Sequence, residues 1–151
     1  MWIEKSEKEF YNDSDAKGLR LFFDDGISEE EKKWCKQFCR WLTKKYWFPI
    51  RCKIFFSSMV KFRSQKRGFC DGIFYSNEEY KTFHYPSIYI ATKFVQEDDK
   101  YYRIFALAHE LTHYFQWYFY EYETKSKRSL EIMATRWANY IVDEYLYENN
   151  L

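Results

Sequence analysis

The chain has 151 residues, of which 46% are hydrophobic and 31% are charged, and this balance excludes both a disordered tail and a membrane protein. Its 24 basic and 23 acidic residues give a formal net charge of +1, so no global basic field is present to bind nucleic acid. The locally basic stretch 61–67 is interpreted as a solvated loop between two strands. We therefore expect a single domain over residues 1–151, without a nucleic-acid partner.

The N-terminal residues hold no apolar run of the kind that forms a signal peptide, and no run of about 18 apolar residues occurs anywhere. We therefore expect a cytoplasmic protein that does not enter a membrane. In that compartment the cysteines are expected to be reduced, half-buried thiols. Their spacing lacks the tight pairs of a structural zinc site, which disfavours a cysteine-based metal centre. The four cysteines are Cys35, Cys39, Cys52 and Cys70.

The first third of the chain predicts a strand and a helix. Residues 19–23 (LRLFF) have a strand composition and are followed by an Asp-Asp-Gly turn. Ser28 stands three residues before a glutamate, which is the pattern of a capping box. Large apolar residues then recur with helical spacing over residues 29–46, and Pro49 ends this helix.

The remainder predicts three short strands and two helices. Residues 52–62 alternate between apolar and polar, as one half-buried strand or two strands with a kink after residue 57. Further strands are expected over 69–75, interrupted at its Asp-Gly pair, and over 87–92. Long helices are expected over 101–122 and 129–147. This order predicts an α+β fold with a small antiparallel sheet.

The motif His-Glu-x-x-His lies in the first of these two long helices. His109 and His113 are four residues apart, so they lie one turn apart on the same helix face and can bind one metal ion. Glu110 projects beside that ion, where it can accept a proton from the attacking water and return it to the leaving amine. Two of the chain's three histidines belong to this motif, and its neighbours are uncharged, as a buried active-site helix requires. The motif therefore predicts a zinc centre.

A catalytic zinc ion usually has three protein ligands and a fourth position open to water. No histidine follows His113, so a downstream carboxylate is expected as the third ligand. Glu131 is the first choice, because it has apolar neighbours and lies far enough along the chain for the backbone to return. Ala134 and Ala138, one turn apart, would let the last helix approach the motif closely. The alternatives that stay open are Glu121, Glu123, Asp143 and Glu144.

The motif together with Glu131-x-x-Ala134-Thr135 resembles the gluzincins, which are zinc peptidases with two histidines and one glutamate as ligands. Among them, the small minimal zincins of the ImmA/IrrE type are similar in length and in lacking a pro-segment. The resemblance covers about residues 86–145 and implies a minimal zincin-like fold, with the third ligand on the C-terminal helix. Two positions depart from the pattern: Thr135 replaces the usual carboxylate that orients a ligand histidine, and Gln116 stands where an apolar residue is more usual.

The resemblance also implies how a substrate would lie. In zincins the edge strand before the active-site helix pairs with an extended substrate, which makes residues 87–92 the expected substrate-binding strand. A further hydrogen-bond donor is expected to stabilise the transition-state oxyanion. The candidates, left open, are His84, Tyr114, Arg136 and Tyr140.

We therefore expect a zinc-dependent metallopeptidase with Glu110 as general base and acid, acting on a peptide or protein. Whether a specific protein partner presents the scissile bond is left open. The alternative is a zinc-binding interaction or regulatory module without turnover. An aromatic content of 24% favours contact surfaces, but a structural metal site has no need of Glu110. A nucleic-acid-associated role for residues 61–67 is opposed by the near-zero net charge.

Overall fold

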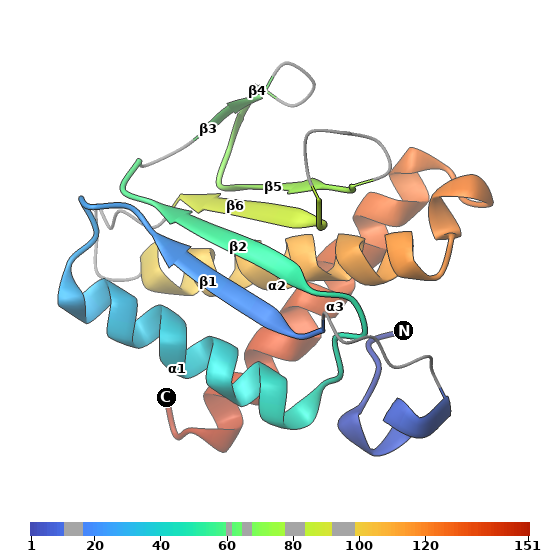
Figure 1. The fold of residues 1–151 in the computed structure, drawn as a ribbon, viewed down its shortest axis with the longest axis horizontal. Helices are drawn as coiled ribbons and strands as arrows, with labels where there is room; N and C mark the ends of the chain where they lie inside the picture. The colour runs from blue at the N-terminus through green and yellow to red at the C-terminus, as the bar shows by residue number, and fades with distance from the viewer. Residues whose placement is uncertain (11–16, 60–61, 65–67, 78–83, 92–98) are drawn as a thin grey trace.

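A four-stranded sheet packed against α-helices forms the fold (Figure 1). This computed structural model describes residues 1–10, 17–59, 62–64, 68–77, 84–91 and 99–151. Its helical elements are η1 (Lys5–Phe10), α1 (Glu29–Lys45), α2 (Asp99–Tyr118), η2 (Glu121–Glu123) and α3 (Lys127–Glu148), of which η1 and η2 are 3-10 helices. Its strands are β1 (Leu19–Phe23), β2 (Cys52–Ser57), β3 (Phe62–Ser64), β4 (Gly68–Cys70), β5 (Gly72–Tyr75) and β6 (Ser87–Ala91).

The predicted element order is confirmed. The Ser28 hydroxyl caps α1 by accepting a hydrogen bond from the Glu31 backbone N–H at 3.2 Å. The predicted strand 52–62 ends at Ser57, as the kink suggested, and the predicted strand 69–75 is divided at Asp71 into β4 and β5. Of the basic stretch 61–67, residues 62–64 form β3, and the others lie outside the described residues.

The predicted antiparallel sheet is wrong. The strand order is β1-β2-β6-β5, in which β1, β2 and β6 are parallel and only β5 is antiparallel to its neighbour. The chain leaves β1, runs back through α1 and enters β2 in the original direction, and a helical crossover of this kind produces parallel neighbours. Apolar alternation shows which residues form a strand, but it carries no information about strand direction.

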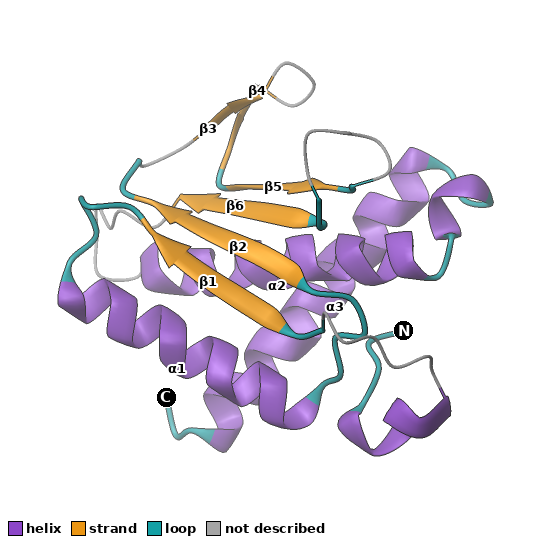
Figure 2. Cartoon of the chain, in the orientation of Figure 1, coloured by secondary structure: helices purple, strands orange, loops and turns teal. Residues whose placement is uncertain are grey.

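Helices α1 and α2 lie against one face of the sheet, and α3 packs against α2 (Figure 2). On that face β2 buries alternate residues, among them Ile54, and β6 buries Ile88 and Ile90. On the opposite face Phe55 stacks between two other rings, with centroids 4.9 Å from Phe22 and 4.8 Å from Tyr89. The alternation of β2 therefore separates the core from a partly exposed aromatic row.

Three of the cysteines are free thiols within the core. Cys35, Cys39 and Cys52 are buried, and burial raises the pKa of each thiol. They are thus more deeply buried than the half-buried thiols we expected. The side chain of Cys70 lies outside the described part of the chain.

The first residues of the chain are bound to both α1 and α2. The Trp47 backbone N–H donates to the Ile3 carbonyl at 2.7 Å, and Glu4 forms an isolated β-bridge with Tyr46 just after α1. The Trp2 indole N–H donates to the Thr112 hydroxyl at 3.0 Å. These contacts fix the Trp2 ring, which is 4% exposed, beside the helix that carries the His-Glu-x-x-His motif.

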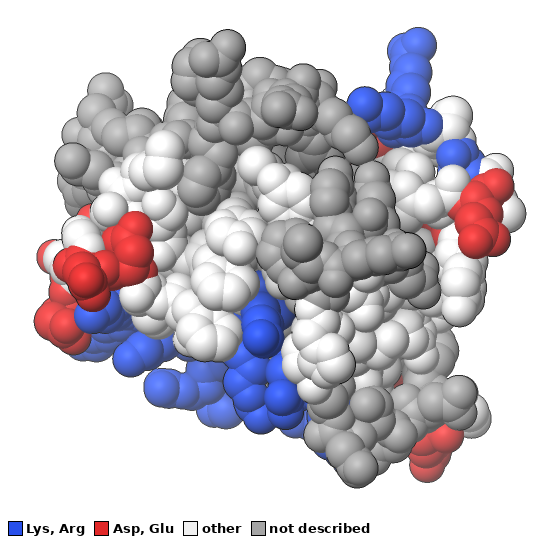
Figure 3. All heavy atoms as spheres, turned by 45° about the horizontal axis from the view of Figure 1, so that its top comes forward, with Lys and Arg blue, Asp and Glu red and all other residues white. Residues whose placement is uncertain are grey.

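Charges of both signs occur on the molecular surface. Figure 3 shows lysines and arginines along the lower edge and at the upper right of the visible face, with acidic residues at its left and right sides. Among the residues that the structure describes, no helix is both long enough and apolar enough to cross a bilayer.

Candidate metal centre

The motif helix α2 lies between the sheet and α3 (Figure 1). Its two histidines contact Glu131 of α3. The imidazole rings of His109 and His113 are 4.8 Å apart between centroids and nearly perpendicular. Their Nε2 atoms are 3.2 Å apart. Glu110 is 3% exposed, and its carboxylate lies close enough to both histidines for the three side chains to form a cluster that could bind a metal ion.

Helix α3 brings Glu131 to the same point. Its carboxylate spans the two histidines, with Oε1 lying 3.0 Å from His113 Nε2 and Oε2 lying 3.1 Å from His109 Nε2. Ala134 and Ala138 are fully buried, as a close approach of α3 to α2 requires. The structure therefore brings together the three residues that the sequence proposed as ligands.

The spacing of these atoms can be compared with that expected around a metal ion such as zinc. Ligand atoms about 2.0–2.1 Å from one tetrahedral zinc ion lie about 3.3 Å from each other. Here the two Nε2 atoms are 3.2 Å apart, which is close to that value, and each lies 3.0–3.1 Å from a different oxygen of Glu131. Glu110 lies within 4.8 Å of both histidines, and Glu131 also has an oxygen close to each Nε2 atom. Both carboxylates are therefore placed where they could take part in a metal centre with His109 and His113.

Gln116 determines which nitrogen of His113 faces this centre. The Gln116 amide Nε2 donates to the Leu130 carbonyl at 2.9 Å, so its Oε1 is turned toward His113 Nδ1, 2.7 Å away. An amide oxygen only accepts, so His113 carries its proton on Nδ1 and, when neutral, directs a lone pair from Nε2 toward Glu131. A lone pair and a carboxylate oxygen 3.0 Å apart need a cation or a proton between them.

The electrostatics of His113 agree with this arrangement. Burial acts to lower its pKa, but the hydrogen bond to Glu131 and the negative charges of Glu110 and Glu131 outweigh that effect and raise it. The surroundings of His113 thus stabilise positive charge at the point where the three side chains meet.

The position of Gln116 was noted in the sequence only as a departure from the family pattern, and its role was missed. Thr135, the other departure from the family pattern, does not orient a histidine as Gln116 does. Thr135 is exposed, and the buried His109 Nδ1 has no hydrogen-bond partner among the described residues. The centre is therefore asymmetric, since Gln116 orients His113 and no described side chain does the same for His109.

Replacing Gln116 by leucine is expected to weaken zinc binding by about 10–100-fold, the effect typical of removing an outer partner of a ligand histidine. The variant keeps the approximate volume of the side chain but loses the acceptor for His113 Nδ1 and the donor to Leu130. Competition titration with a chromophoric chelator measures the affinity. Thr135→Ala is the matched control and is expected to bind zinc as the wild type does. Equal affinities for Gln116→Leu and the wild type would contradict the assigned role.

The edge of the sheet near the centre is β5 and not β6, so the expected substrate-binding strand was wrong. Strand β6 pairs on one side with β2 and on the other with β5, and Thr92 of the predicted strand lies outside the described residues. Gly72, the first residue of β5, lies against Glu110: a β-carbon there would be 2.9 Å from Glu110 Cγ. Buried Arg103 of α2 also pairs with Asp71 at 3.4 Å, which ties the start of β5 to the motif helix.

Replacing Gly72 by alanine is expected to lower the free energy of unfolding by about 1–3 kcal/mol, the usual cost of overpacking. The added methyl group would lie 2.9 Å from both Glu110 Cγ and Ile90 Cδ1, so at least one side chain must move. Urea denaturation followed by circular dichroism measures the change. An unchanged transition midpoint would mean that both neighbours yield without cost.

The four candidate oxyanion donors do not meet at this centre. The prediction of Tyr114 as a donor is wrong, because its hydroxyl donates to the Ile50 carbonyl at 2.5 Å and accepts from the Ile50 N–H at 2.9 Å within the core. Arg136 and Tyr140 line a separate pocket. His84 is exposed, with its ring against Tyr85.

A tyrosine that the sequence did not single out lies nearer. The ring of Tyr122, in η2, is 6.3 Å from the His113 ring between centroids and is 47% exposed. It stands in the segment that connects α2 with α3, where the chain reverses. The chain has 15 tyrosines, so nothing in the sequence distinguished Tyr122 from the others.

The alternative third ligands are engaged elsewhere or exposed. Glu121 pairs with Lys125. Glu144 accepts a hydrogen bond from the Tyr46 hydroxyl at 2.8 Å. Glu123 and Asp143 are exposed. None of these four carboxylates is recorded in contact with His109 or His113 in the described part of the chain.

No protein-family model, curated protein or solved structure matches this chain. The class of the site therefore follows from its geometry alone. It is a cluster of His109, Glu110 and His113 that could hold a metal ion, within a mixed α+β fold.

Proposed function

We propose that the protein is a zinc-dependent metallopeptidase of the gluzincin type, with a minimal zincin-like fold. The observation that carries this proposal is the convergence of His109, His113 and Glu131 within 3.0–3.2 Å, with buried Glu110 beside them. Two imidazoles and one carboxylate form a ligand set used by catalytic zinc sites. A zinc ion bound there would polarise the scissile carbonyl and lower the pKa of water in its open position.

Glu110 is the residue to which we assign proton transfer. Its carboxylate accepts a proton from the attacking water and then donates that proton to the nitrogen of the leaving amine. Its burial, 3% exposed, supports this role, because a carboxylate shielded from bulk water responds strongly to the charges around it. A metal site that served only structure would gain nothing from the buried Glu110 carboxylate in addition to that of Glu131.

Strand β5 is the surface on which we place the substrate. Its pairing with β6 uses one side of the strand, and Gly72 at its start brings the β5 backbone against Glu110. An extended peptide that added to the other side of β5 would run past the carboxylate that performs proton transfer. The substrate class supported is therefore a peptide or an exposed protein segment, which a partner protein would present.

The centre is accessible to solvent on the side where the Glu131 carboxylate lies. The Glu131 side chain is 38% exposed, whereas that of His113 is 2% exposed, so the centre is buried on one side and reaches solvent on the other. An open position for water and substrate is what separates catalytic zinc sites from structural ones. We also retain a cytoplasmic location as part of the proposal, supported by the three free thiols of the core.

The test is peptide-bond cleavage by zinc-reconstituted protein. A peptide mixture of known sequences is incubated with it, and new termini are identified by mass spectrometry, with a chelated sample as the control. Cleavage that requires zinc supports the proposal. One zinc ion per chain without any new termini would instead favour a zinc-binding interaction or regulatory module.

A further inference from the structure

A second site lies on the side of α3 that carries Trp137 and Tyr140. It is a pocket of about 300 Å³, at the lower end of the range of small-molecule sites. Six residues line it: Trp2, Glu4, Tyr46, Arg136, Trp137 and Tyr140. None of them belongs to the metal centre, so this pocket needs an explanation of its own.

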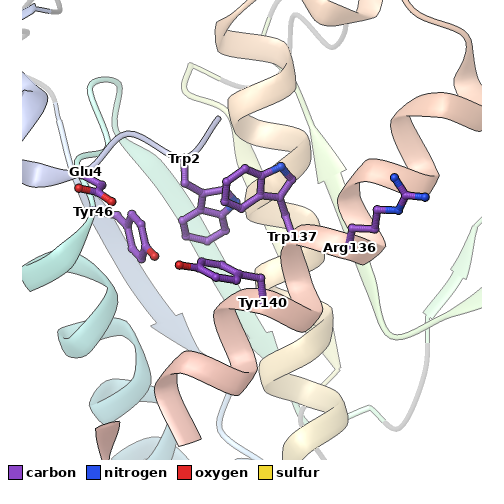
Figure 4. Close-up of a pocket in the computed structure, with 6 residues that line it drawn as sticks. All are labelled: Trp2, Glu4, Tyr46, Arg136, Trp137 and Tyr140. Atoms are coloured by element: carbon purple, nitrogen blue, oxygen red, sulfur yellow. The ribbon is translucent and has the colours of Figure 1, made fainter. Parts of the chain in front are cut away.

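Four aromatic rings surround the pocket (Figure 4). They form two edge-to-face pairs: Trp2 with Tyr46, at 71° and 5.1 Å between centroids, and Trp137 with Tyr140, at 85° and 5.8 Å. Within each pair the ring planes are nearly perpendicular, so the walls of the pocket face in several directions. Ring faces carry negative electrostatic potential, which attracts a cation placed among them.

The rings are held in place before any ligand arrives. Trp2 is 4% exposed, and its indole N–H donates to Thr112, so its ring is fixed and its polar group is already used. The hydroxyl ends of Tyr46 and Tyr140 point toward each other in Figure 4. Glu144 accepts a hydrogen bond from Tyr46 at 2.8 Å, and a hydrogen bond to Glu144 also raises the pKa of Tyr140. Ligand binding would therefore cost little side-chain ordering.

The charges around the pocket favour a cation. The Glu4 carboxylate lies at the rim beside Tyr46, and no hydrogen bond or ion pair to it is recorded among the described residues. The nearby Lys45 ammonium is neutralised by two carboxylates, those of Glu144 at 3.0 Å and Glu148. The Arg136 side chain extends away from the rings (Figure 4). The acidic residue of the lining, Glu4, thus lies beside the rings, whereas the basic one, Arg136, is turned away from them.

We propose that this pocket binds a trimethylammonium group, such as that of choline or of a trimethylated lysine side chain. The rings would surround the methyl groups, and Glu4 would supply the opposite charge at the rim. A trimethylammonium group has no N–H and needs no hydrogen bond, which suits a pocket where the Trp2 indole N–H and the Tyr46 hydroxyl already donate to Thr112 and Glu144. The proposal is independent of the peptidase proposal.

The experiment compares choline with 3,3-dimethyl-1-butanol, its uncharged isostere, by calorimetric titration of the full chain. We expect saturable binding of choline and at least about tenfold weaker binding of the isostere, because only the cation gains from the ring faces. Equal affinities, or no saturable binding of choline, would overturn the proposal.

Nε-trimethyllysine and unmodified lysine complete the series. Tighter binding of trimethyllysine than of choline indicates a methylated protein as the source, the reverse order indicates a choline compound, and equal binding of unmodified lysine counts against the proposal.

Three variants separate the charge from the shape of the pocket. Trp137→Leu keeps an apolar wall but removes a ring, and it is expected to weaken choline binding at least about tenfold. Glu4→Gln is expected to weaken it severalfold, whereas Arg136→Gln, the matched control, should bind choline as well as or better than the wild type. Circular dichroism confirms folding, and Tyr140→Leu, at a 55% exposed position, replaces Trp137→Leu if that variant does not fold. Unchanged choline affinity in the folded ring variants would contradict the assignment.

Discussion

Replacing Glu110 by glutamine is expected to lower peptide-bond cleavage by about 10²–10⁴-fold while leaving about one zinc ion per chain. The loss is that of general acid–base catalysis, since an amide cannot accept the proton of the attacking water. Glutamine has nearly the same shape, so His109, His113 and Glu131 keep their positions. Elemental analysis gives the zinc content, and the rate of appearance of new peptide termini gives the activity.

The assignment of proton transfer to Glu110 requires that Glu110→Gln loses activity and keeps its zinc. The control is Glu123→Gln, which makes the same chemical change at an exposed position and is expected to keep full activity. Gln116→Glu would not serve, because it would add a charge beside His113. If Glu110→Gln lost zinc in proportion to activity, Glu110 would be a ligand. If it cleaved peptides at the wild-type rate, proton transfer would belong to another group.

Replacing Glu131 by alanine is expected to weaken zinc binding more than Gln116→Leu does. The loss of an outer partner such as Gln116 is expected to cost about 10–100-fold in affinity. The variant leaves only His109 and His113, and two imidazoles do not complete the three protein ligands of a catalytic site. A ligand that binds only the folded state also raises the unfolding temperature. The stabilisation that zinc gives the wild type should therefore be strongly reduced in Glu131→Ala.

The control for this prediction is Glu123→Ala, which removes an exposed carboxylate from the segment between the two helices. It should bind zinc and be stabilised by it as the wild type is. Wild-type zinc affinity in Glu131→Ala would exclude Glu131 as a ligand and would reopen the question of which carboxylate completes the centre. A wild-type protein that binds no zinc after reconstitution would return both histidines to the status of core residues.

The sequence was sufficient to predict the three α-helices, most strands and the His109, Glu110 and His113 cluster that could bind a metal ion. The cap at Ser28, the alternation of β2 and the helical spacing around His109 and His113 are all local patterns, and each depends on neighbours within a few residues along the chain. Two histidines four residues apart on a helix must share a face whatever the rest of the fold does. These features were therefore predictable without knowledge of the tertiary structure.

Other features depended on which distant segments meet. The sequence proposed Glu131 from its surroundings, but only the packing of α3 on α2 puts its oxygens 3.0 and 3.1 Å from the two histidines. Gln116 departs from the family pattern in the sequence, and only the structure shows its amide between His113 and the Leu130 carbonyl, where it connects two helices. Long-range hydrogen bonds of this kind leave no periodic signal along the chain.

Strand direction and sheet order were likewise decided by tertiary structure. Strand composition and the alternation of residues 52–62 predicted strands over 19–23, 52–62, 69–75 and 87–92, yet these patterns could not show that β1, β2 and β6 are parallel or that β5 forms the edge beside Glu110. Alternation reports which side of a strand is buried, whereas pairing is set by the crossover through α1 and by the segments inserted between β2 and β6. The sequence by itself thus determined the local chemistry of the motif helix, and the tertiary packing determined which side chains and which strand edge surround it.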